Sequence, residues 1–160
     1  MVNTIPEDMY ADSHIQKCTP QLALEVGLNL REDDKNEIEQ VLGLRAPVGT
    51  LYSYYESNHC VYFHSPDGKA AGVAGVTPGN HIWMLCTPVI EERPHIFVRN
   101  AKRWLDSLPH KYVYNYADMR NEVHIKLLKF MKFKFIHYKV VNGVPLIGFI
   151  KLCVPPQPQA

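Results

Sequence analysis

The 160-residue sequence lacks the features that mark several classes of protein. Its net charge is only +1, so it carries no electrostatic signature of a surface that binds nucleic acid or membrane. It has no run of about 18 apolar residues and no recognisable signal peptide. We therefore expect a soluble protein made in the cytoplasm, with no membrane partner, and the charge balance argues against a nucleic-acid partner.

Patterns for metals, disulfides and nucleophiles are missing as well. The four cysteines have no CxxC or CxxxC spacing, which indicates free thiols in a reducing compartment. The eight histidines form no HxH, HxxxH or HExxH pattern, so no metal site is predicted. No Ser/His/Asp or Cys/His arrangement has the local signature of a catalytic nucleophile.

What the chain does have is enough apolar side chain for one core. Hydrophobic residues make up 46% of the sequence, and this length suits a single domain. We predict an N-terminal arm over residues 1–19, one domain over residues 20–152, and a proline-rich tail over residues 153–160.

Local patterns predict the elements of that domain. Helical spacing of apolar residues occupies residues 20–30, 31–42, 95–108 and 121–131. β-type composition occupies residues 51–56, 60–64, 70–76, 81–87, 112–116, 133–138 and 145–152. The Asn142-Gly143 pair between two β runs is a hairpin signal. The order predicts an α/β (α+β) fold with a mixed, mainly antiparallel sheet flanked by about four helices.

The segment over residues 112–138 carries a family resemblance. It resembles the strand and helix that end the core of GNAT-type N-acetyltransferases, with the form N-x-x-(A/S)-x-x-(L/F)-Y-x-x-x-G-F. The corresponding positions are Asn121, His124, Leu127, Leu128, Lys132 and Phe133. A narrower pattern, N-x-x-H-I-x-x-L-K, is similar to small internal virion proteins of short-tailed phages that keep a GNAT-like core. It is matched by Asn121, His124, Ile125, Leu128 and Lys129.

The resemblance implies a phosphate cradle that the sequence does not supply. GNAT enzymes hold the cofactor phosphates on a glycine-bearing turn between the central strand and the next helix, where backbone N–H groups converge. Here that turn corresponds to residues 88–96. Arg93 could contact a phosphate there, but the segment has no glycine and has two prolines, each of which lacks a backbone N–H. No glycine occurs anywhere between Asn80 and Asn142.

Two further positions depart from the GNAT pattern. Leu128 stands where the family has the tyrosine that protonates the leaving thiolate, and leucine donates no proton. Lys132 replaces the motif glycine, which puts the turn geometry of the family in doubt. Tyr112, Tyr114, Tyr116 or His124 could substitute as the acid, and Glu91 or Glu92 as a base, but packing and surface roles are the simpler interpretation of each.

From these departures we predict a non-catalytic protein without cofactor. The resemblance to internal virion proteins implies a structural or assembly component of a tailed-phage virion, as an internal virion or head–tail-region protein. Its partners would be other virion proteins, such as portal, tail or internal core proteins, and copies of itself in a symmetric oligomer. The predicted contact residues are Tyr52, Tyr54, Tyr55, Pro155, Pro156 and Pro158.

Two alternatives remain open at this point. One is an active N-acetyltransferase that uses acetyl-CoA, with Arg93 and Asn121 as the cofactor-binding candidates. The other is a small host-takeover protein that binds a bacterial enzyme. One fold hosts many functions, so fold alone does not choose among them.

Overall fold

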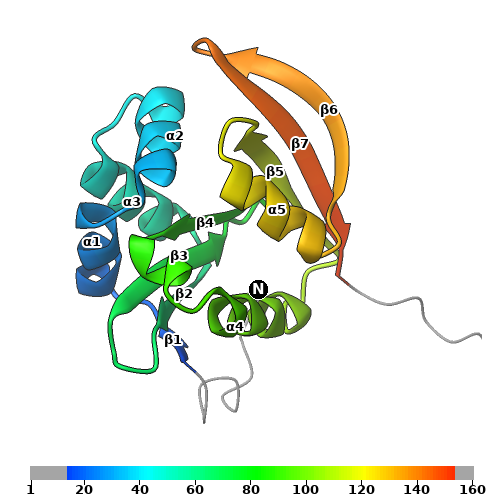
Figure 1. Ribbon diagram of the computed structural model, residues 1–160. Helices are drawn as coiled ribbons and strands as arrows, with labels where there is room; N and C mark the ends of the chain where they lie inside the picture. Colours follow the sequence, from blue (N-terminus) through cyan, green and yellow to red (C-terminus); the bar gives the residue numbers. More distant parts are fainter. Residues whose placement is uncertain (1–13, 154–160) are drawn as a thin grey trace, which may run out of the picture.

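A computed structural model describes residues 14–153 and confirms a mixed α+β fold (Figure 1). The elements are β1 (Ile15–Lys17), α1 (Pro20–Leu28), α2 (Glu32–Leu42), α3 (Ala46–Glu56), β2 (His59–His64), β3 (Ala70–Val76), β4 (Ile82–Cys86), the 3-10 helix η2 (Pro88–Glu91), α4 (Pro94–Asp106), β5 (Tyr112–Asp118), α5 (Glu122–Phe130), β6 (Lys134–Val141) and β7 (Val144–Leu152). β1 pairs with β2, so the sheet begins inside the segment predicted as an arm. The predicted contact residues Pro155, Pro156 and Pro158 lie outside the described residues.

The strands form two antiparallel sheets that meet at one point. The first has the order β1-β2-β3-β4 and the second the order β5-β7-β6. They join where His81 forms a parallel bridge with Tyr114, whose N–H donates to the Asn80 carbonyl at 3.1 Å. The Asn115 side-chain amide adds a hydrogen bond of 2.8 Å to the Ile82 carbonyl. Beyond this contact no further backbone pairing joins β4 to β5 within residues 14–153, and the two strands diverge (Figure 1).

Helices cover both faces of the first sheet. On one face Ala23 and Val26 of α1 pack with Tyr62 and Val73 of the sheet. On the other face α4 and α5 share a larger core, in which Trp104 is almost fully buried. No helix among the described residues combines the length and hydropathy needed to cross a membrane.

The strand predicted over residues 51–56 is wrong, because these residues form the second half of α3. Its aromatic composition suggested a strand, but Pro47 at the start and the spacing of the buried residues Ala46, Gly49 and Thr50 are helical. Gly27 of α1 lies so close that a Cβ there would be 2.9 Å from the Pro47 Cα. The tight contact between α1 and α3 needs a helix with small residues at this face.

Two turns follow backbone rules that the sequence signalled. Asn142 (φ 51°) and Gly143 (φ 78°) both have positive φ, as the primed hairpin turns require, which confirms the predicted hairpin. Lys132 also has positive φ, at 69°. The doubt about the turn geometry was therefore misplaced, because the lysine itself adopts the left-handed conformation that favours glycine.

Candidate active site

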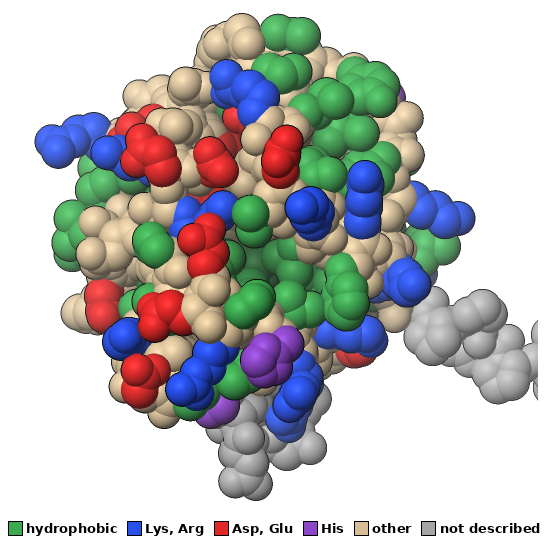
Figure 2. Space-filling view, in the orientation of Figure 1, with side chains coloured by type: hydrophobic (Ala, Val, Ile, Leu, Met, Phe, Trp, Pro, Cys, Tyr) green, Lys and Arg blue, Asp and Glu red, His purple; other side chains and the backbone are tan. Residues whose placement is uncertain are grey.

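The divergence of β4 and β5 opens a cleft of about 340 Å³. One set of lining residues comes from α4, α5 and the turn after α5: Ala101, Trp104, Leu105, Leu127, Leu128 and Met131. A second set comes from α2, β6 and β7: Ile38, Val41, Leu42, Lys139, Val141 and Leu146. Figure 2 shows an apolar hollow in the middle of the face that carries α5. A mainly apolar cleft of this size is typical of a small-molecule site.

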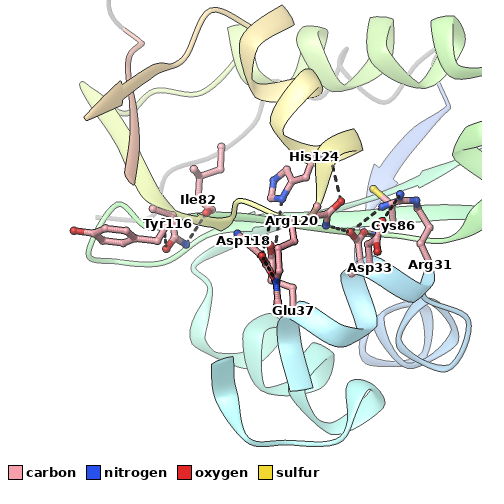
Figure 3. A network of polar contacts seen from close by, with 12 residues as sticks. Arg31, Asp33, Glu37, Ile82, Cys86, Tyr116, Asp118, Arg120 and His124 are labelled. Atoms are coloured by element: carbon pink, nitrogen blue, oxygen red, sulfur yellow. Dashed lines mark hydrogen bonds and ion pairs between the residues drawn. The ribbon is translucent and has the colours of Figure 1, made fainter. Parts of the chain in front are cut away.

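A histidine and a carboxylate face each other across the two halves of this lining. His124 Nδ1 of α5 lies 3.8 Å from Glu37 Oε2 of α2, and both side chains line the cleft (Figure 3). Their side chains are only 15% and 16% exposed. The other Glu37 oxygen accepts a 2.7 Å hydrogen bond from the Asp118 N–H, which holds the carboxylate toward α5.

This environment raises the pKa of His124. Burial alone would lower the pKa, but the neighbouring carboxylates of Glu37 and Asp34 outweigh burial. A histidine with its pKa set by a carboxylate partner inside a cleft is a candidate for proton transfer.

A buried polar network fixes the two helices that carry this pair. Asp34 of α2 accepts hydrogen bonds from the Asn121 amide (2.7 Å), Arg31 Nη1 (3.0 Å) and the Cys86 N–H (2.8 Å) (Figure 3). Burial raises the pKa of Asp34, while His124, Asn121 and Arg31 act in the opposite direction. Asp34 thus connects α2, the end of β4 and the start of α5 through one side chain.

The same network closes the end of β4. The Arg31 N–H donates to the Cys86 carbonyl at 2.9 Å, while the Cys86 N–H is taken by Asp34. Arg31 Nε also reaches Glu91 of η2, with 3.3 Å between the nitrogen and Oε1. Both backbone groups of Cys86 are therefore engaged by α2 and the residue that precedes it.

The loop after β4 does not form the glycine-bearing phosphate cradle that GNAT enzymes have. It is the 3-10 helix η2, in which Pro88 contributes no N–H. Four N–H groups at this turn donate inside the protein: Thr87 to Ala71 O, Val89 to Thr87 Oγ1, Ile90 to Thr87 O and Glu92 to Val89 O. Two carboxylates, Glu91 and Glu92, lie beside it in ion pairs with Arg31 and Lys69. The turn at Pro88–Glu91 therefore offers no cluster of unengaged N–H groups to the phosphates of a CoA cofactor.

Leu128 is buried in the core, in agreement with a packing role. Among the tyrosines considered as substitutes, Tyr116 lines the cleft. Its hydroxyl is hydrogen-bonded to His137 Nε2, and Lys139 Nζ lies 3.7 Å from the centre of its ring. Tyr114 instead lies against His81 at the junction of the sheets, with the two rings tilted by 48° and their centres 4.6 Å apart.

The predicted cofactor residues lie away from the cleft lining. Arg93 is exposed, immediately before α4, and lines a separate cavity of about 60 Å³. Asn121 is buried, where its oxygen caps α5 by accepting the His124 N–H and its amide binds Asp34.

The predicted contact tyrosines all belong to α3. Tyr52 and Tyr55 are 51% and 70% exposed, while Tyr54 packs against the core. No other protein chain accompanies the described residues, so the role of these tyrosines in contacts with a partner stays a prediction.

Glu37 is the functional candidate that sequence reasoning missed. A signal was present, because Asp34, Glu37, Ile38 and Val41 follow the i, i+3, i+4, i+7 spacing of one helical face. Carboxylates on a face that also carries core residues point inward, toward α5.

Comparison with known proteins supports the class of fold. No family model and no curated protein matches the sequence. A GNAT-family acetyltransferase structure from Bacillus cereus matches with a TM-score of 0.62 and 13% identity over 88% of this chain and 97% of that one. A GNAT-family acetyltransferase from Bacillus anthracis matches at 0.63, with 10% identity over 86% and 93%. A spermidine N-acetyltransferase from Vibrio cholerae matches at 0.60, with 12% identity over 87% and 94%. The chain therefore has the fold of the GNAT-type acetyltransferases.

These matches overturn the predicted virion role. The matching structures named above are acetyltransferases, and nothing in the comparisons supports a phage particle, a virion location or a structural component. The expectation that the chain is not an enzyme is contradicted for the same reason. The prediction of a non-catalytic protein rested partly on the missing glycine cradle. A cradle concerns how a cofactor is held, so its absence does not decide whether a reaction site exists. At 10–13% identity the likeness establishes the fold alone.

Proposed function

We propose that this chain is an N-acetyltransferase that moves an acetyl group from a thioester, with acetyl-CoA as the donor suggested by the fold, to an amine in the cleft between β4 and β5. The observation that carries this proposal is the His124–Glu37 pair, 3.8 Å apart, inside a mainly apolar cleft of about 340 Å³. The likeness to acetyltransferase structures supports it.

His124 is the proposed base. An amine is protonated near neutral pH and must lose a proton before its lone pair attacks an acyl carbon. With Nδ1 held toward Glu37, the imidazole takes that proton at Nε2, and the carboxylate stabilises the imidazolium that results. As the amine nitrogen bonds to the acetyl carbon, the carbon–sulfur bond of the donor would break and the imidazolium would return its proton to the departing thiolate. The amide nitrogen would release its remaining extra proton to water. The Asp118 N–H and the Asp34 network keep the two side chains in position.

The donor would supply the acetyl group as a thioester, with its slender arm against the apolar residues of α4 and α5. Trp104, Leu127 and Met131 are the residues that would hold the arm and exclude water. The turn at Pro88–Glu91 offers the phosphates no cluster of unengaged N–H groups, so no role in the reaction is assigned to it.

The acceptor half of the cleft favours a monoamine with an apolar body. Its walls are Ile38, Val41 and Leu146, and its charged lining residues are Glu37 and Lys139. One carboxylate matches one ammonium group, and Lys139 repels further positive charge. Spermidine, named for the Vibrio cholerae enzyme, is a polycation and fits this lining less well than an aromatic or branched aliphatic amine.

The test is acetyl transfer by the purified protein. Acetyl-CoA and S-acetylpantetheine are each incubated with a panel of aromatic, aliphatic and polycationic amines, and acetylated products are detected by mass spectrometry. Calorimetric titration and thermal shift measure donor binding alongside, because a ligand that binds the native state raises the melting temperature.

Variants connect the activity to the site. His124→Gln is expected to lower kcat by about 100-fold or more, the usual contribution of a general base, while donor affinity stays unchanged. Glu32→Gln, an exposed carboxylate of the same helix as Glu37, is the matched control and is expected to behave as the unmodified protein. The proposal fails if no amine is acetylated from either donor, or if His124→Gln retains full kcat.

A further inference from the structure

We propose that Cys18 and Cys60 form a redox-active thiol pair, which closes to an intramolecular disulfide when a hydroperoxide oxidises it. All four cysteines of the chain are free thiols, and these two lie opposite each other at the end of β1. The inference is independent of the proposed acetyl transfer, because neither cysteine belongs to the lining of the cleft.

The pairing of β1 with β2 brings the two cysteines together. Lys17 is the partner of Val61, so continuing the register by one position pairs Cys18 with Cys60. The Cys18 N–H agrees with this register, since it donates to the Cys60 carbonyl at 3.1 Å. Opposed residues of an antiparallel pair have Cα atoms about 4.5–5.5 Å apart, within the range of about 4.4–6.8 Å that a disulfide spans. The bond therefore needs no change of register.

Both side chains lie on the same face of the first sheet. Cys18 is buried in the apolar cluster between this sheet and α1, and Cys60 packs against that cluster while it remains partly exposed. The two thiols are hydrogen-bonded to each other. The partly exposed Cys60 gives a small oxidant a route from solvent to the pair.

The two thiols differ in acidity. The hydrogen bond from Cys60 lowers the pKa of Cys18 against the opposing effect of burial, and the backbone of Thr19 and Ala23 at the start of α1 acts in the same direction. The same hydrogen bond, together with burial, raises the pKa of Cys60. Cys18 is therefore the sulfur that attacks the oxidant, and Cys60 keeps its proton until the second step.

One hydroperoxide balances the reaction. The Cys18 thiolate attacks a peroxide oxygen, so that a sulfur–oxygen bond forms, the oxygen–oxygen bond breaks, and the sulfur is oxidised by two electrons to a sulfenic acid. The departing hydroxide takes up the proton that Cys18 had released. The Cys60 sulfur then attacks the Cys18 sulfur, the sulfur–oxygen bond breaks, and the Cys60 proton leaves with the hydroxyl group as water. With hydrogen peroxide the products are the disulfide and two water molecules.

The other two cysteines provide internal comparisons. Cys86 is buried at the end of β4, and burial together with the charge of Asp34 raises its pKa. Burial also raises the pKa of Cys153, whose thiol donates to the Lys151 carbonyl at 3.8 Å. A raised pKa leaves less thiolate, so both thiols should react with peroxide more slowly than Cys18.

The disulfide would close a loop that contains α1, α2 and α3, and with α2 the candidate residue Glu37. It would also fasten β1, a three-residue strand at the edge of its sheet. A cross-link over a long loop restricts the unfolded chain, so we expect the oxidised protein to melt about 5–10 °C higher than the reduced protein.

Peptide mapping without reduction tests the pair. The protein is treated with hydrogen peroxide at neutral pH, and the remaining thiols are alkylated. Trypsin then places the four cysteines in four different peptides, residues 18–31, 46–69, 70–99 and 152–160. We expect peptides 18–31 and 46–69 to be joined, with a mass about 2 Da below their sum, and dithiothreitol to separate them. Peptides 70–99 and 152–160 should stay alkylated.

Variants assign the two roles. Cys60→Ser should stop the reaction at the sulfenic acid of Cys18, which dimedone traps. Cys18→Ser should give neither the joined peptides nor a dimedone adduct on Cys60, because the pKa of that thiol is raised by burial. Cys153→Ser is the matched control and should form the disulfide as the unmodified protein does.

Three outcomes would overturn the proposal. The first is a folded, peroxide-treated protein in which peptides 18–31 and 46–69 are not joined within one molecule. The second is dimedone labelling that is no greater for Cys60→Ser than for Cys18→Ser. The third is an oxidised monomer that melts below the reduced one, which would show that the native strands do not hold the two sulfurs in a position to bond.

Discussion

Replacing Asp34 with asparagine removes the carboxylate that connects α2, β4 and α5. The side chain keeps its shape but exchanges one acceptor oxygen for an NH₂ donor. Whichever way the amide is oriented, at least one buried donor among Asn121, Arg31 and the Cys86 N–H then faces another donor. A buried donor without an acceptor costs about 1–3 kcal/mol.

The loss of charge adds to that cost. Arg31 is only 7% exposed and loses its 3.0 Å partner, although Glu91 remains at 3.3 Å and Asp33 at 3.7 Å. Loss of one member of a buried ion pair usually lowers the free energy of unfolding by about 3–5 kcal/mol. Because Glu91 and Asp33 still compensate the charge of Arg31, we expect Asp34→Asn to lie at the low end of this range. We expect the free energy of unfolding to fall by about 3 kcal/mol, and the melting temperature by about 6–12 °C for a chain of this size.

Equilibrium unfolding in urea at pH 7 measures this change by linear extrapolation. Asp33→Asn is the matched control, because it removes the same charge from the adjacent residue, whose side chain is 53% exposed. It should change stability by no more than about 0.5 kcal/mol. A loss below about 1 kcal/mol for Asp34→Asn, or an equal loss for Asp33→Asn, would refute the buried network as a stabilising connection.

Three further outcomes are expected. Lys132→Gly should stabilise the fold by up to about 1 kcal/mol in the same urea assay, since φ is 69° there and glycine adopts it without strain; a loss of stability would contradict this. Gly27→Ala should destabilise by about 1–3 kcal/mol, because its Cβ would meet the Pro47 Cα at 2.9 Å; Glu25→Gly and Glu25→Ala at an exposed position of α1 calibrate helix propensity, and an unchanged or raised stability of Gly27→Ala would contradict the close contact. The raised pKa of His124 predicts that kcat/KM increases as pH rises through that pKa, which lies above the ordinary histidine value of about 6.5. It also predicts that the contribution of His124 to folding stability is fully present below about pH 6.5 and is lost as pH rises through the raised pKa. A pH–rate profile and urea unfolding at acidic and alkaline pH check both, with His124→Gln as the variant in which each dependence should weaken.

Much of the chain's local structure was predictable because short-range patterns set it. Apolar spacing in the segments that became α4 and α5, and the Asn142-Gly143 turn, depend on residues within a few positions of one another. The failure over residues 51–56 has the same origin. Aromatic composition favours a strand locally, whereas Pro47, the helical spacing of Ala46, Gly49 and Thr50, and the packing of α3 on Gly27 of α1 favour the helix.

The sequence by itself determined the types and order of most elements, and the departures at Leu128 and Lys132 from the GNAT pattern. The tertiary structure alone decided the site, because its residues come from distant parts of the chain. Asp34 and Asn121 are separated by 87 positions, and Asp34 and Cys86 by 52. Their meeting depends on how β4 and β5 diverge and how α2 and α5 dock over the gap. These are contacts between elements that no periodicity within one element records.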